Sequence, residues 1–342
     1  MGNNLRTLFL KKIKKIKIDT IIRDKSLVID AQSWTYQFLN SYTDSIGLPF
    51  KNSQGKVISH IWGFLKRIAI LSKYTKKIII VTDPETLPRA SIKAKTKKNR
   101  QEIRQNNLKK FQELLKNNTD QEILKKQARY TTEVTSQIVN LLKEFTELLG
   151  LPFIRAYHQG EVTCAKLCQR GLADICLVDD WDIVYHKVDY VLRMIDYNTL
   201  KGELLELRSW QKENNYDNLQ LYDTSILSGN DYSKGIQGIG PIGAYKLIKT
   251  YGSLEDLLSA IKKKQISDKK LQLSDQKIKE LELIRKEGII IFNENLVTTI
   301  EFSKPDFVKI KNFLINSCSF KPESVWPYFK KLYLHFRAIS NL

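Results

Sequence analysis

Short apolar runs alternate with longer amphipathic stretches along the first two thirds of the chain. In each run Val, Ile and Leu follow one another with little polar interruption, which is typical of parallel strands covered on both faces. The runs that we predict as strands span residues 26–30, 77–83, 151–156, 175–180 and 190–196. Residues 57–74 and 131–150 lie between them and carry the spacing of amphipathic helices. This alternation predicts an α/β fold around a twisted parallel sheet.

Two regions lack this alternation. Residues 84–128 hold no strand pattern, and the stretch from Arg89 to Arg100 contains six basic residues and no acidic one. It predicts a helical insertion with a positive face, which is either a solvated excursion or a contact for phosphates. Its position directly after the strand that ends in Asp83 favours phosphate contact. From about residue 219 the pattern is mainly helical, with one further strand pattern at 297–302.

The overall charge indicates the class of partner. The 342 residues include 56 Lys and Arg against 37 Asp and Glu, a net charge of +19, which indicates nucleic acid first and an anionic membrane surface second.

A hydrophobic fraction of 42% excludes a disordered chain. No run approaches the roughly 18–20 apolar residues of a membrane span. Four cysteines without a CxxC pair argue against a disulfide scaffold and a structural zinc site, and indicate a reducing intracellular compartment. The basic run at 11–17 is a nuclear address, a phosphate contact or the solvated face of a helix.

Acidic residues recur where the predicted strands end. In open α/β sheets, ligands bind outside the carboxyl ends of the strands. The acids at or just beyond these ends, with one later in the chain, are Asp30, Asp83, Glu161, Asp180, Asp182 and Asp231. Any single one could be a turn or cap residue, but converging carboxylates raise one another's pKa unless cations neutralise them. Oxygen ligands without His or Cys select Mg²⁺ or Mn²⁺, so the pattern predicts two-metal phosphodiester hydrolysis.

A glycine-rich segment at 228–258 is the second strong motif. Gly238-Ile239-Gly240-Pro241, followed by Gly243, predicts a hairpin between two helices. The glycines let the backbone approach a phosphate, and the amides at the following helix N-terminus face that anion. Such an element holds a duplex without reading its sequence. An ordinary Gly-Pro turn is the alternative, and the basic Lys246 and Lys249 favour the duplex contact.

Taken together, these blocks resemble the flap endonuclease branch of the XPG family of structure-specific 5′ nucleases over nearly the whole chain. The similar blocks, in the family's order, are MGNNL, LVIDAQSWTYQFL, SQGKVISHIWGFLKR, GLPFIRAYHQGEVTCAKL, LVDDWDIV and SGNDYSKGIQGIGPIGA. The resemblance implies a PIN-like fold: a mainly parallel sheet with helices on both faces, a helical arch, and a helical C-terminal region with a helix–two-turn–helix motif. We expect nuclease segments at 1–84 and 131–218, the arch or gateway at 85–130, and the duplex-binding and helical C-terminal region at 219–342.

The resemblance also implies roles for individual residues. Two Mg²⁺ ions, replaceable by Mn²⁺, would be held by Asp30, Asp83, Gln159, Glu161, Asp180, Asp182 and Asp231. Alongside these acids, two arch residues, Lys93 and Arg100, would be catalytic by stabilising charge on the transferring phosphoryl group. The residues expected to contact DNA are Gly2, Tyr36, Arg89, Lys97, Lys98, Gly238, Gly240, Gly243 and Lys246. A K⁺ ion at the hairpin carbonyls is a further expectation.

Two positions depart from the family pattern. Gln159 stands where the family has the first glutamate of a Glu-x-Glu pair, so an amide replaces a charge. The hypothesis from this change is weaker binding of the first ion or a shift in metal preference. Pro84 follows Asp83 where the family usually has glycine, which changes the entry into the arch. Among the tryptophans, Trp62, Trp181 and Trp326 are predicted core residues, whereas Trp34 lies close enough to Tyr36 to line a DNA path.

The function implied by the resemblance is 5′ flap endonuclease and 5′–3′ exonuclease activity on branched or nicked DNA, in replication, repair or recombination. The alternatives are a catalytically weakened scaffold that binds branched DNA, which Gln159 favours, and an RNase of the PIN type, which residues 236–251 disfavour. We expect an intracellular monomer at the nucleus or another site of DNA replication, such as a viral factory. The C-terminus shows no sliding-clamp motif, so no clamp partner of the usual type is expected.

Overall fold

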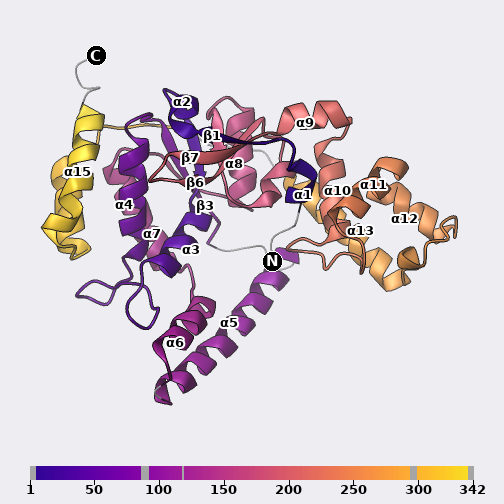
Figure 1. Ribbon diagram of the computed structural model, residues 1–342, viewed down its shortest axis with the longest axis horizontal. Coiled ribbons are helices and arrows are strands. Elements are labelled where there is room, and N and C mark those ends of the chain that lie inside the picture. The colour runs from indigo at the N-terminus through magenta and orange to yellow at the C-terminus, as the bar shows by residue number, and fades with distance from the viewer. Residues whose placement is uncertain (1–4, 86–91, 118, 293–298, 338–342) are drawn as a thin grey trace.

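A single mixed sheet forms the centre of the molecule. The computed structural model describes residues 5–85, 92–117, 119–292 and 299–337. Seven strands lie in the order β1-β7-β6-β5-β2-β3-β4 (Figure 1). Their bounds are β1 Ile13–Lys17, β2 Leu27–Asp30, β3 Ile78–Thr82, β4 Phe153–Arg155, β5 Ile175–Leu177, β6 Tyr190–Asp196 and β7 Lys201–Glu206.

The five strands from β6 to β4 are mutually parallel, which confirms the predicted α/β fold. Every residue of β2 and of β3 is buried. Alternate residues of β3 enter opposite cores: Ile78 and Ile80 pack on one face, Ile79 and Val81 on the other. Helices on both faces therefore explain why these strands are continuously apolar.

The two antiparallel strands, β1 and β7, were not among the strands predicted from the sequence. Strand β1 pairs with β7, and β7 pairs with β6. The interpretation of residues 11–17 as a basic helix face is wrong, because residues 13–17 form this edge strand. Its lysines are solvated or paired, as for Lys14 with Glu206 at 2.7 Å, and Lys12, just before the strand, pairs with Glu213 at 2.6 Å. Lysines on an edge strand oppose pairing with further strands.

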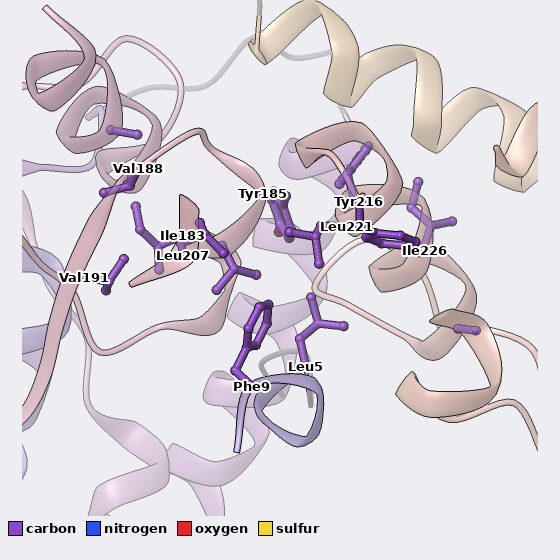
Figure 2. Close-up of a cluster of buried hydrophobic side chains, with 14 of the residues drawn as sticks. Leu5, Phe9, Ile183, Tyr185, Val188, Val191, Leu207, Tyr216, Leu221 and Ile226 are labelled. Carbon is purple, nitrogen blue, oxygen red and sulfur yellow. The ribbon is translucent and has the colours of Figure 1, made fainter. Parts of the chain in front are cut away.

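Helices cover both faces of the sheet (Figure 1). One face carries α2 (Ile18–Ile22), α3 (Ala31–Ser41), α4 (Ser59–Leu71), α7 (Ser136–Leu148), α14 (Phe307–Asn312) and α15 (Pro322–Arg337). The other face carries α1 (Arg6–Phe9), α8 (Gly160–Gln169), α9 (Leu207–Asn214) and α10 (Asn218–Ser228). Two buried side chains, from α1 and from its N-cap Leu5, lie between the sheet side and α10. Figure 2 shows Leu5 and Phe9 beside Ile183, Leu207 and Leu221. This core fixes the C-terminal helices to the sheet.

The basic insertion is a helical pair. Helix α5 (Ile92–Lys116) extends away from the sheet, and α6 (Gln121–Ala128) packs beside it (Figure 1). Phe111, Leu124 and Ala128 form a small core between them. Arg104 of α5 pairs with Glu133 at 2.7 Å, which ties the pair to the chain that returns to α7.

The C-terminal helices divide into two groups. Helices α10, α11 (Pro241–Tyr251), α12 (Leu254–Lys262) and α13 (Asp275–Phe292) pack together, whereas α14 and α15 lie against α7 and α4 on the far side of the sheet (Figure 1). Buried Asp223 joins the first group by accepting hydrogen bonds from Arg285 Nε at 2.7 Å and from the Leu254 amide at 2.9 Å. The strand expected at 297–302 is wrong for its described part, since residues 299–302 have no strand conformation. The segment boundaries given above stay a prediction.

Two tryptophan predictions are also wrong. Trp34 is 1% exposed and packs against Phe38 and Phe64, so it lines no DNA path. Trp326 is 54% exposed rather than part of the core. No helix in the described ranges has the length and apolar character needed to cross a membrane.

Candidate active site and duplex-binding surface

The carboxyl ends of neighbouring parallel strands bring acids together. Asp30 is the last residue of β2, and its register partner Val81 lies two residues before Asp83. The position of Gly160, at the start of α8, shows how close these two acids are. A Cβ at that glycine would lie 3.2 Å from Asp30 Oδ1 and 3.5 Å from Asp83 Oδ1. The Gly160 amide donates to Asp83 Oδ1 at 2.9 Å, so the helix start is fixed against the acids.

The pKa values of two of these acids respond to burial and to the charges of their neighbours. Burial, and next the charge of Asp83, raise the pKa of Asp30 to about 7. Burial also raises the pKa of Asp180, with the charge of Asp231 adding to the effect. Buried carboxylates that raise one another's pKa favour a cation among them.

Hydrogen bonds or an ion pair with other protein groups are made by Asp30, Asp83, Asp180 and Asp231. Asp30 Oδ1 accepts from the Gln32 amide at 3.0 Å, and Asp180 Oδ1 from the Asp182 amide at 3.2 Å. All the acids offer hard oxygen donors, which fits Mg²⁺ or Mn²⁺. Within the part of the chain that the structure describes, no three His, Cys, Asp or Glu side chains already form a ligand group for one ion.

Helix α5 brings a cation to this cluster. Arg100 of α5 forms an ion pair with Asp231, Nη2 to Oδ2 at 2.7 Å, although α5 and Asp231 are far apart in sequence. Lys98, on the same helix, is exposed. Lys93 and Lys97 belong to α5 by their backbone, and their side chains lie outside the described part, as do Gly2 and Arg89 entirely.

Tyr36 is an exposed ring close to the strand that carries Asp30. It lies one turn into α3, the helix that starts directly after Asp30, and it is 43% exposed. The structure therefore leaves its face open to a ligand near the acids.

The glycine-rich hairpin lies between α10 and α11, as expected from the sequence. Gly238 has φ +79°, a conformation that strains any other L-residue. Gly240 caps α11, and Pro241 is its first residue. A side chain at Gly240 would meet no atom within 4 Å, and one at Gly243 only Ile239 at 3.7 Å, so this backbone is open to a large ligand. Lys246 is exposed beside it, whereas Lys249 bonds to Tyr245 and Asn214 within the protein.

Comparison with known proteins places this architecture in a family. A sequence model of the XPG N-terminal domain matches residues 5–107, and one of the XPG I-region matches residues 150–231. Together the two matches cover more than half of the chain. The chain belongs to the XPG family.

Individual proteins of this family match across most of their length. The flap endonuclease 1 of Staphylothermus marinus is 29% identical over 346 residues, covering 95% of this chain and 92% of the relative. The flap endonuclease 1 of Entamoeba dispar is 29% identical and covers 94% of this chain and 83% of the relative.

Two solved structures share the fold. The catalytic core of Rad2 in complex with DNA substrate has a TM-score of 0.69 at 21% identity, covering 97% of this chain and 100% of that chain. Flap endonuclease-1 from Methanococcus jannaschii has a TM-score of 0.66 at 24% identity, covering 96% and 98%.

Gln159, the position that departs from the XPG pattern, is buried and points to a residue that the sequence analysis missed. Its Nε2 donates to the hydroxyl of Tyr232. Burial raises the pKa of Tyr232 well above its usual value, and the charges of Glu161 and Asp182 raise it further. The phenol thus stays neutral among the acids. Its place directly after Asp231 was the only signal in the sequence.

Arg193 is a second residue that the sequence analysis missed. It lies in the middle of the apolar β6, is 4% exposed, and stacks over the Trp181 ring at 3.7 Å. Its guanidinium donates to the backbone carbonyl of Asp179, and its charge acts to lower the pKa of Asp180. A lone arginine inside an apolar strand was the available signal, because a buried charge needs partners.

Proposed function

We propose that this XPG-family chain is a structure-specific 5′ nuclease, which hydrolyses a phosphodiester of branched or nicked DNA that carries a 5′ flap. One observation carries the proposal: acids from several parallel strand ends lie close together, and Arg100 of α5 forms an ion pair with one of them. The chain around them has a net charge of +19, which suits a polyanionic substrate. The family membership and the flap endonuclease names of relatives that match over most of their length support it.

Asp30, Asp83, Glu161, Asp180, Asp182 and Asp231 would hold two divalent ions. Such ions supply a nucleophilic water at neutral pH and stabilise the attacking and leaving oxygens. The protein's part is to hold the acids at fixed strand ends and to exclude other ligands. The Gly160 amide on Asp83 and the Gln32 amide on Asp30 fix two of these carboxylates.

Arg100 would move between two anions. In the structure it pairs with Asp231, about half of its side chain being exposed. When a phosphodiester enters, the guanidinium can exchange this carboxylate for the phosphoryl oxygens, where it offsets charge that develops in the transition state. Lys93 would assist from the same helix. Tyr36 would stack on a base beside the scissile phosphate, and the open hairpin at Gly238–Gly243 would hold the duplex.

The test is cleavage of a double-flap DNA labelled at its 5′ end, in Mg²⁺, beside an unbranched duplex of the same sequence. The proposal expects a product cut one nucleotide inside the duplex, formed far faster from the flap than from the duplex and absent with Asp180→Ala. Tight binding without a cut, in both Mg²⁺ and Mn²⁺, would instead indicate a DNA-binding scaffold.

A further inference from the structure

The loop between β4 and α8 presents an exposed aromatic ring at the edge of the sheet where the acids lie. Tyr157 is 71% exposed, compared with 43% for Tyr36. It follows the paired positions Thr82 and Arg155, where β3 and β4 end, and it lies four residues before Glu161. The ring is therefore close to the acidic cluster in the fold without being part of the hydrophobic core.

The backbone on both sides of Tyr157 is bonded to the segment that carries Asp83. The Ala156 amide donates to the Thr82 carbonyl at 2.9 Å, and the Gly160 amide donates to Asp83 Oδ1 at 2.9 Å. Because the loop is held at both points, the fold sets where Tyr157 lies relative to Asp83. The ring does not have to bury itself to be held there.

Two neighbouring side chains stabilise the loop and leave the Tyr157 ring accessible. Arg155 donates to Glu85 from Nη1 and to Asn140 from Nη2, each at 2.7 Å, which joins the end of β4 to the chain after β3 and to α7. His158 packs on Tyr157 with ring centroids 4.7 Å apart at an angle of 74°. Such an edge-to-face contact orients the tyrosine ring, and the exposed remainder of that ring is open to a ligand.

The order of the strands places this ring opposite Tyr36. Strand β3 lies between β2 and β4, and Asp83 follows it directly. Tyr36 belongs to the helix that follows β2, whereas Tyr157 belongs to the loop that follows β4. The two exposed rings therefore lie on either side of the strand that Asp83 follows.

We propose that Tyr157 is a stacking site for an unpaired nucleobase of the 5′ flap strand, across the scissile phosphate from the base at Tyr36. The inference rests on the proposed function for the identity of the strand. Stacking on an aromatic ring accepts any base, because every base has a π-face, so the site is independent of sequence. A hydrogen bond from the phenol hydroxyl to a phosphate is the competing role for this side chain.

The experiment measures binding of a double-flap DNA by fluorescence anisotropy in Ca²⁺, with gels to confirm that the DNA stays uncut. Tyr157→Ala is expected to raise the dissociation constant about five- to 150-fold, the range for one stacked base. Binding of the same nicked duplex without its flap should be unchanged. Tyr157→Phe keeps the ring and should bind like wild type. So should the matched control Tyr190→Ala, since Tyr190 is 48% exposed at the start of β6, on the opposite edge of the parallel strands.

An abasic scan identifies the stacked base. Each nucleotide near the flap junction is replaced in turn by an abasic residue, and binding is measured for wild type and for Tyr157→Ala. At the stacked position, removal of the base should weaken wild-type binding as much as Tyr157→Ala does. It should weaken binding by the variant no further, because two changes that remove one contact are not additive.

Three results would overturn the proposal: binding by Tyr157→Ala within twofold of wild type, equal losses in Tyr157→Phe and Tyr157→Ala, or losses that add at every abasic position. The second result would assign the contact to the hydroxyl. None of them depends on cleavage. A wild-type protein that binds the flap but never cuts in Mg²⁺ would defeat the nuclease and leave the stacking site measurable, whereas normal cutting with unaffected binding by Tyr157→Ala would defeat only the stacking site.

Discussion

The acidic cluster and the hairpin surface would meet the same phosphodiester chain, yet they are built in opposite ways. The acids lie at or just beyond strand ends, on α8 and after α10, with Asp30 and Asp182 buried. Burial, together with the charges of neighbouring acids, raises the pKa of Asp30 and of Asp180. The glycines and lysines around 235–277 lie on helix ends and turns, mostly exposed and separate. Buried, coupled charges act as a unit, whereas exposed ones each contribute little and are screened by salt. Chemistry should therefore fail outright when one acid is changed, while binding declines in small steps.

The largest expected effect is in the acidic cluster. Asp30→Asn should reduce cleavage by at least about 10³-fold, because it removes several kcal/mol of charge stabilisation at a metal site. The same change should raise the free energy of unfolding by about 1–4 kcal/mol at pH 8 in EDTA, since it removes a buried carboxylate whose pKa is raised to about 7. Single-turnover kinetics and denaturant unfolding measure the two. A variant that is both inactive and less stable would contradict the repulsion described for this cluster.

The next effect is at Arg100, which brings a cation from α5 to the acidic cluster. Arg100→Ala should lower the single-turnover rate by roughly 10²-fold, since it removes one cation from the transition state, while the dissociation constant for flap DNA changes little. Lys109→Ala, an exposed lysine further along α5, is the matched control and should stay close to wild type. Equal losses in both variants would show that α5 contributes only general positive charge.

A third prediction concerns stability against pH. His60 is fully buried, and burial lowers its pKa to about 3. Below pH 6.5 the unfolded chain binds a proton at this residue that the folded chain does not, so its contribution to stability falls as pH falls, by up to about 1.4 kcal/mol per pH unit.

Asp30 has the opposite slope between pH 3.8 and about 7, because there the folded state holds the extra proton. The two slopes offset one another in wild type. Unfolding curves of Asp30→Asn in EDTA should therefore lose stability more steeply between pH 6.5 and 5 than those of wild type. Parallel curves for the two proteins would contradict this assignment.

The smallest expected effect is at Gln159. Gln159→Glu should shift the Mg²⁺ concentration for half-maximal cleavage downward by a few fold, since it adds a charge beside the ions. It also replaces the amide that donates to Tyr232. Tyr232→Phe removes the same hydrogen bond without adding charge, so it should leave the metal dependence closer to wild type. Identical Mg²⁺ and Mn²⁺ titrations for wild type and Gln159→Glu would reject the hypothesis on this position.

The central strands and the strand-end acids could be predicted from sequence because each follows from a local pattern. Continuous burial produces the apolar runs, and the ends of parallel strands meet at one edge by topology. Strand β1 could not be predicted, since its lysines suit a helix face as well as an edge strand until its partner β7 is known. The Arg100–Asp231 pair and the Lys270–Gly238 contact join residues 131 and 32 positions apart. Nothing local in the sequence specifies such contacts.

The central claim is that the acidic cluster catalyses cleavage while the hairpin surface supplies binding. The most direct test measures the cleavage rate and the dissociation constant on one double-flap DNA for two variants. Asp180→Ala is expected to abolish the cut in Mg²⁺ and to keep binding within a few fold of wild type. Lys246→Gln, beside the hairpin, is expected to bind more weakly, with a lower salt slope, and to cut at the wild-type rate once DNA is saturating. An Asp180→Ala protein that still cuts, or a Lys246→Gln protein whose rate at saturating DNA is lost, would contradict the account.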